Sequence, residues 1–168
     1  MKPFKLFIIV IALLTSCTLH SNELDMTGVW IGENITDNEH RKIYTHRSKE
    51  GYYFSRHEYY NEGVMVKWLH NYGLWGQNEN KFWTEFIVYA SDKSVKSLHD
   101  CNPPKFSYFI QSIYQNNAVY VTENDGVEYT MKRIKKLPVE FFTNNVILQD
   151  FAINKIKTFL KECRNIIK

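Results

Sequence analysis

The chain has 168 residues, of which 15% are aromatic and 23% charged, and its formal net charge is +3. Without Lys2 and Lys5, which lie at the very start of the chain, 19 basic residues face 18 acidic ones. That balance excludes the strongly basic surface of a nucleic-acid-binding protein. The length suits one domain with one hydrophobic core.

The first predicted element is a signal peptide over residues 1–16. Two lysines precede the apolar run Leu6–Leu14, and a basic start followed by a short apolar run is typical of secretory signals. The run is shorter than the ~20 residues that a membrane-spanning helix needs. Leu14-Thr15-Ser16-Cys17 resembles the lipobox of bacterial lipoproteins. The resemblance implies cleavage before Cys17 and lipidation of that cysteine.

An ordinary signal peptide, cut at an A-x-A-like site, is the alternative, but no such site follows the apolar run. Several acyl chains on Cys17 would hold the protein stably on a membrane. The next residue is Thr18 rather than Asp, which in the enterobacterial sorting scheme implies the outer membrane, facing the periplasm. The sequence therefore predicts a lipid-anchored envelope protein, with residues 17–26 as the lipidated tether.

Residues 27–136 are predicted to form a β-barrel. Short runs rich in aromatic and β-branched residues alternate with Asn- and Gly-containing turns, the pattern of strands joined by hairpins. We expect a mainly β fold, an antiparallel meander that closes into a lipocalin-like up-and-down barrel. An open curved sheet capped by a helix would show the same pattern. The eight predicted strands are Thr27–Asn34, Arg41–Arg47, Tyr52–Tyr60, Val64–Trp75, Lys81–Ala90, Phe106–Gln115, Ala118–Glu123 and Val127–Lys135.

Two further segments complete the predicted domain. Ser91–Lys105 is the longest break in the meander and is predicted to be a structured loop or a lid. After the barrel, apolar residues recur at nearly helical spacing, so Asn145–Ile166 is predicted to be an amphipathic α-helix. Residues 137–168 as a whole are expected to pack on the barrel through this helix.

The cysteines predict a disulfide. If Cys17 carries lipid, Cys101 and Cys163 remain, and export delivers both to an oxidising compartment, where pairing is expected. Two unpaired buried thiols, or a metal pair, are the alternatives. The pairing would pin the predicted helix against the barrel.

Two Gly-x-Trp triplets mark strand ends: Gly28-Val29-Trp30 opens the first predicted strand and Gly73-Leu74-Trp75 closes the fourth. The first triplet, followed by the meander, resembles the start of lipocalins and related calycin-like barrels. The resemblance implies that Trp30 plugs the closed end of the barrel, beneath an arginine of the last strand that Arg133 would supply. A helix tied back by a disulfide also resembles lipocalins. The chain is thus similar to a small lipocalin-like bacterial lipoprotein.

Candidate ligand-binding residues come from alternation along the strands, which places every second side chain on one face. One face is expected to combine aromatic and polar groups, and if it lines the barrel it forms a small-ligand site. The alternatives are an interior filled by side chains and a solvated position for Arg56 and Glu58. The face is expected to hold Arg56, Glu58, Trp68, His70, Tyr72, Phe82, Phe86 and Tyr108, and the ligand-binding candidates are Arg56, Trp68, His70, Tyr72, Phe86 and Tyr108.

No catalytic constellation or metal-binding motif is recognised, and the histidines are scattered. Glu123-Asn124-Asp125-Gly126 is predicted to be a hairpin turn rather than a calcium loop. We therefore expect a protein that is not an enzyme and uses no cofactor or metal. The first hypothesis is a binding domain for a small apolar or aromatic ligand. The second is a solid barrel that docks or inhibits an envelope protein partner.

Overall fold

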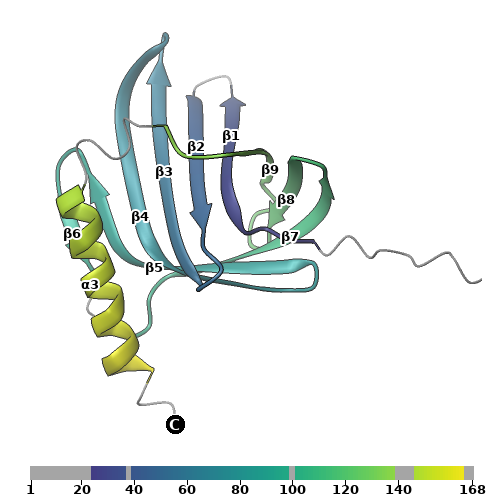
Figure 1. Cartoon of the computed structure of the whole chain (residues 1–168). Helices are drawn as coiled ribbons and strands as arrows, with labels where there is room; N and C mark the ends of the chain where they lie inside the picture. The colour runs from purple at the N-terminus through teal and green to yellow at the C-terminus, as the bar shows by residue number, and fades with distance from the viewer. Residues whose placement is uncertain (1–23, 37–38, 99–100, 139–145, 165–168) are drawn as a thin grey trace, which may run out of the picture.

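The structure, a computed structural model, describes residues 24–36, 39–98, 101–138 and 146–164. The predicted signal peptide, Cys17 and most of the tether lie outside these residues. The described part forms nine strands and one long helix (Figure 1). They are β1 (Gly28–Thr36), β2 (Glu39–Arg47), β3 (Tyr52–Asn61), β4 (Val64–Asn78), β5 (Lys81–Ser91), β6 (Val95–Ser97), β7 (Lys105–Tyr114), β8 (Asn117–Thr122), β9 (Glu128–Ile134) and α3 (Val146–Cys163).

Eight of the strands close into an up-and-down barrel in which all neighbours are antiparallel. The order is β4-β3-β2-β1-β9-β8-β7-β5, and β5 pairs back with β4 to complete the ring. The prediction of a mainly β, eight-stranded antiparallel barrel followed by a helix is confirmed. The short β6 pairs with β5 beside the ring. It lies in the segment predicted to be a loop, because three residues are too few for a strand pattern to show.

Turn chemistry explains why the strand limits were predictable. At the β3–β4 hairpin, Glu62 and Gly63 have φ angles of 50° and 79°. Two consecutive left-handed residues form the turn that matches the twist of paired strands, and glycine adopts this conformation without steric cost. The predicted turn between β8 and β9 is also present, and there the Thr122 hydroxyl donates a hydrogen bond to the Asp125 carboxylate.

The closed end of the barrel is built around Trp30, which is fully buried. Its indole Nε1 donates to the backbone oxygens of Met26 and Thr27, each at 3.1 Å. The Arg133 guanidinium lies over the indole, 4.5 Å from the ring centroid. The tryptophan and arginine arrangement implied by the resemblance to lipocalins is therefore present. The Arg133 Nη2 also donates to the Asp25 oxygen at 2.6 Å, which holds the chain entering β1 against this end.

Helix α3 packs on the outside of the barrel, along β4 and β5 (Figure 1). Ala152, Ile156 and Phe159 recur at helical spacing and form a buried cluster with residues of the two strands. Burial of this apolar stripe keeps the helix on the sheet. No helix in the described residues is both long enough and apolar enough to cross a membrane.

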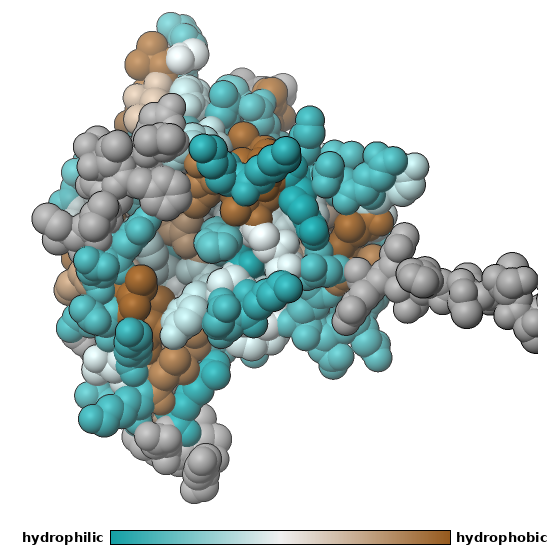
Figure 2. Space-filling view, viewed as in Figure 1, coloured by the Kyte–Doolittle hydropathy of each residue, from teal (hydrophilic) through white to brown (hydrophobic). Residues whose placement is uncertain are grey.

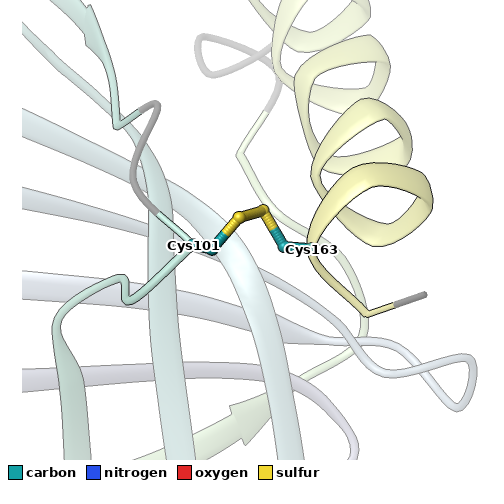
Figure 3. Close-up of a disulfide and its surroundings, with 2 residues drawn as sticks. All are labelled: Cys101 and Cys163. Atoms are coloured by element: carbon teal, nitrogen blue, oxygen red, sulfur yellow. A yellow bond between two sulfur atoms is a disulfide. The ribbon is translucent and has the colours of Figure 1, made fainter. Parts of the chain in front are cut away.

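A disulfide joins Cys101, between β6 and β7, to Cys163, the last residue of α3, as predicted (Figure 3). The two Cα atoms are 5.2 Å apart. The bond ties the end of the helix to a loop of the barrel, so the helix is held both by apolar packing and by a covalent link.

Candidate ligand-binding site

The structure separates the predicted ligand-binding residues onto two faces of the sheet. Arg56, Trp68, His70 and Tyr72 lie together on the outer face of β3 and β4, where Arg56 pairs with His70 in the strand register. Phe86 and Tyr108 lie inside the barrel, where both pack against the core cluster that contains Trp30. The expectation that all of them share one face is therefore wrong.

A β-bulge in β5 causes the separation. Tyr72 pairs with Val88 and Gly73 pairs with Phe86, so Ile87 is an extra residue without a partner in β4. For every residue beyond an extra residue, the side chain lies on the opposite face of the sheet from the one that simple alternation predicts. Val88 consequently lies outside with Tyr72, whereas Phe86 lies inside, although both have the same parity in the sequence.

Gly73 is the residue that permits this bulge. A Cβ atom at this position would lie 1.7 Å from the backbone oxygen of Glu85. Only glycine allows the two strands to approach so closely. The second Gly-x-Trp triplet thus marks an irregularity of the sheet as well as a strand end.

The outer-face candidates bind one another. The Arg56 Nε lies 2.7 Å from a Glu58 carboxylate oxygen, and the Tyr60 hydroxyl donates to the other oxygen at 2.8 Å. The Arg56 Nη1 lies 3.1 Å from His70 Nε2, and the Tyr72 hydroxyl lies 3.3 Å from His70 Nδ1. Glu58 and His70 are both buried, so this network is a desolvated polar cluster rather than a set of free anchors.

The network fixes the protonation of His70. Burial lowers the pKa of His70 to about 3, and the positive charge of Arg56 acts in the same direction. His70 is therefore neutral at pH 7. Since a guanidinium only donates, Nε2 of His70 accepts from Arg56, which leaves the proton on Nδ1 to donate to the Tyr72 oxygen.

Inside the barrel, a cavity of about 190 Å³ is lined mainly by aromatic rings. Its wall extends from Arg47, the last residue of β2, to Thr122 at the end of β8 and Asp125 in the β8–β9 turn. Several residues of this wall, among them Tyr53 and Tyr120, also belong to the core cluster that contains Trp30. The aromatic residues lining the cavity are Tyr53, Phe86, Phe106, Tyr108, Tyr120 and Tyr129.

Ring packing holds the cavity wall in place. Tyr53 stacks on Phe86 with centroids 5.7 Å apart, and Phe82 stacks on Tyr108 at 4.6 Å. Tyr120 meets Phe82 edge-on at 5.0 Å. Offset-stacked and edge-on contacts are the favourable arrangements of aromatic pairs. These contacts hold the side chains of the wall in defined positions.

Arg47 is the buried charged residue of this wall, and sequence reasoning missed it. It is the last residue of β2 and only 2% exposed. Its guanidinium carbon lies 4.7 Å from the Phe82 centroid and 5.8 Å from those of Tyr53 and Tyr120. Alternation along β2 could have revealed it, because Arg47 follows the inward-facing Ile43 and Thr45 at every second position. A charged residue at a strand end is usually solvated, however, which argued against an inward position.

Tyr53, Tyr108 and Tyr120 around Arg47, and His57 on the same wall, are neutral at pH 7. Burial raises the pKa of Tyr120 to about 12, and it also raises the pKa values of Tyr53 and Tyr108. Burial lowers the pKa of His57 to about 4, with a further contribution from Arg41. A neutral phenol can donate or accept a hydrogen bond, but it carries no charge that would neutralise Arg47.

A second concavity, of about 710 Å³, lies outside the barrel between β3, the segment after β9 and helix α3. Phe54 and Tyr72 of the sheet, Leu137, and Ile153 and Ile156 of the helix form much of its apolar wall. Tyr72 is the one predicted ligand-binding residue that contributes to it. Sequence reasoning missed this groove because it arises where segments far apart in the chain meet.

No known protein-family model matches the sequence, and no curated protein matches it. The closed eight-stranded barrel with its C-terminal helix is consistent with a lipocalin-like fold. The described residues contain no group of three or more His, Cys, Asp or Glu side chains placed to hold a metal ion.

Proposed function

We propose that this chain is a lipid-anchored envelope protein whose barrel binds a small apolar or aromatic molecule, without catalysing a reaction on it. The observation that carries the proposal is the aromatic cavity inside the barrel. An apolar cavity of about 150 Å³ accommodates a benzene molecule, so a volume of about 190 Å³ suits one ring with a small substituent.

The chemistry of the wall supports the same proposal. Ligand sites combine apolar surface with a few polar groups that orient the ligand. Here Phe86 and Phe106 supply apolar surface, while Thr45, His57 and the tyrosine hydroxyls supply hydrogen-bonding groups. Because the rings already pack on one another, little ordering cost remains for the ligand to overcome.

The anchoring part of the proposal rests on the sequence. The lipobox-like residues before Cys17 and the non-Asp residue Thr18 support lipidation and placement on the outer membrane, facing the periplasm. Replacement Cys17→Ser should leave an uncleaved precursor that takes up no labelled palmitate. Labelling that persists in this variant would overturn the anchor. Replacement Ser21→Ala in the same tether is a matched control and should leave labelling unchanged.

Partner docking is the second candidate function, and exposed apolar residues favour it. Val64 and Val66 near the tip of the β3–β4 hairpin are 66% and 59% exposed, and Ile35 near the tip of β1 is 72% exposed. Figure 2 shows hydrophobic surface at the tip of the β3–β4 hairpin, uppermost in this view. Exposed apolar patches often mark protein–protein contacts.

Native mass spectrometry of the full chain, purified gently in detergent from its own envelope, tests the ligand proposal. We expect a small mass that leaves when the protein unfolds. Ile43→Phe adds a ring at the cavity wall and should abolish this mass, whereas Ile35→Phe, at an exposed position, should not. If no preparation of the chain carries a bound small molecule, the result contradicts the ligand proposal and favours a search for a protein partner.

A further inference from the structure

We propose that the ligand of the barrel is a small carboxylate, with an apolar or aromatic body, and that Arg47 binds its anionic group. This inference rests on the proposed function and names the ligand class. It starts from the position of Arg47, which lines the cavity while being almost completely buried.

A buried guanidinium is costly unless its charge and its N–H groups find partners. The Nη1 of Arg47 donates to the Thr45 hydroxyl at 3.1 Å, and Tyr120 accepts a second hydrogen bond. The Nε has no acceptor in the described part of the chain, and no carboxylate there forms an ion pair with Arg47. Three aromatic faces offset part of the cost, but they accept no conventional hydrogen bond.

The surroundings of the cavity are electrostatically suited to an anion. Asp125 is the only carboxylate that lines it among the described residues, and it is exposed to solvent, which screens its charge, on the β8–β9 turn. Further along the inner face, the cations of Arg41 and Lys67 both lie over the Tyr59 ring, at 5.9 Å and 5.0 Å. An entering anion would therefore meet positive charge at the wall and beyond it.

The shape of the site selects among anions. A guanidinium and a carboxylate are both planar and match through paired hydrogen bonds. The cavity is too small for a long acyl chain, and its rings favour a flat apolar body. A carboxylate attached to one aromatic ring satisfies both requirements, and the Thr45 and tyrosine hydroxyls could bond the oxygen that faces away from Arg47.

Isothermal titration calorimetry of the full chain in detergent tests this inference, with phenylacetate compared against its neutral analogue phenylacetamide. We expect phenylacetate to bind about tenfold more tightly or better, because a hydrogen bond to a charged group is worth at least that factor. Arg47→Gln should remove the preference for the acid without weakening the amide. Arg47→Lys, which keeps the charge but not the planar fork, should retain a reduced preference.

Lys42→Gln is the matched control, because Lys42 lies on the same strand but on the outer face, near Glu33. It should leave both affinities unchanged. Equal binding of acid and amide, or an acid preference that survives in Arg47→Gln, would overturn the role of Arg47 and leave the proposed function standing. Failure of both probes to bind, together with an empty native mass spectrum, would overturn both.

Discussion

The guanidinium of Arg133, in the last strand, covers the indole of Trp30, in the first, at 4.5 Å from the ring centroid. The two residues are also directly paired between β1 and β9. The contact therefore lies on the seam where the first and last strands meet to close the barrel. The two residues are 103 positions apart in the sequence, so their contact forms only when the whole meander closes into the barrel.

We expect Trp30→Ala to lower the free energy of unfolding by about 3–5 kcal/mol, because it empties a fully buried site. Arg133→Met should lower it by about 1–3 kcal/mol, through loss of the cation–π contact and of the bond to the Asp25 oxygen. Urea unfolding followed by circular dichroism measures both changes. Lys132→Met, on the exposed face of β9, is the control and should have little effect. An Arg133→Met variant as stable as this control would contradict the proposed contribution of Arg133 to closure.

Gly73→Ala should be much more damaging than Gly63→Ala. A Cβ at Gly73 would collide with the backbone of Glu85, which cannot move without breaking the β4–β5 pairing. We expect a loss of about 3 kcal/mol or more. At Gly63 nothing lies within 4 Å, so only the left-handed backbone conformation is penalised, by roughly 1–2 kcal/mol. Urea unfolding, or the yield of folded protein where a variant is too unstable, compares the two. Similar losses would contradict the role of Gly73 in the bulge.

The same bulge shows how far the sequence predicts this molecule. Strand limits were predictable to within about three residues because Gly- and Asn-containing turns interrupt the runs on both sides. The face of the sheet on which each side chain lies was predictable only as far as the β-bulge in β5. The grouping of Arg56, Trp68, His70 and Tyr72 on one face was right. Nothing in the local sequence of β5 reveals that Ile87 is extra, so Phe86 and Tyr108 were assigned to the wrong face.

Arg47 illustrates a different limit. Strand alternation places it inside with Thr45, but the free energy of burying a charge argues against that position. Its burial becomes understandable only when Phe82 and Tyr120, from β5 and β8, surround it. These contacts depend on closure of the barrel, which no local pattern encodes. The concavity outside the barrel, which Leu137 lines together with residues of β3 and α3, was unpredictable for the same reason: it forms only where distant segments meet.

Stability should depend on pH through His70. Its pKa in the folded protein is about 3, below the usual value of 6.5, so the unfolded chain binds more protons between these two values. Stability is therefore fully present above pH 6.5 and falls as the pH is lowered toward 3, by up to about 1.4 kcal/mol per pH unit for this group. Between pH 5 and 6.5, most carboxylates are already ionised and obscure the effect little.

The variant His70→Gln tests this dependence. We expect it to be less stable at pH 7, because it disturbs the bonds to Arg56 and Tyr72, but to show a shallower slope of stability against pH between 5 and 6.5. Urea unfolding at several pH values measures the slope. His57→Gln should also reduce it, since burial lowers the pKa of His57 to about 4. A slope that His70→Gln leaves unchanged would contradict a neutral, buried His70.

The Cys101–Cys163 bond should contribute strongly to stability, because it closes a separation of 62 residues between a barrel loop and the end of α3. In the chain-entropy account, removing a cross-link over such a separation costs about 4 kcal/mol. The double variant Cys101→Ala with Cys163→Ala should lose a comparable amount in urea unfolding, and reduction of the natural chain should reproduce that loss. Reductant should not change the stability of the double variant, and this control excludes effects of the reductant other than cleavage of the disulfide.

In the natural chain, unfolded without reductant, neither cysteine should react with an alkylating reagent. Alkylation of both would show that the bond is absent, and α3 would then be held by non-covalent contacts, among them those of Ala152, Ile156 and Phe159.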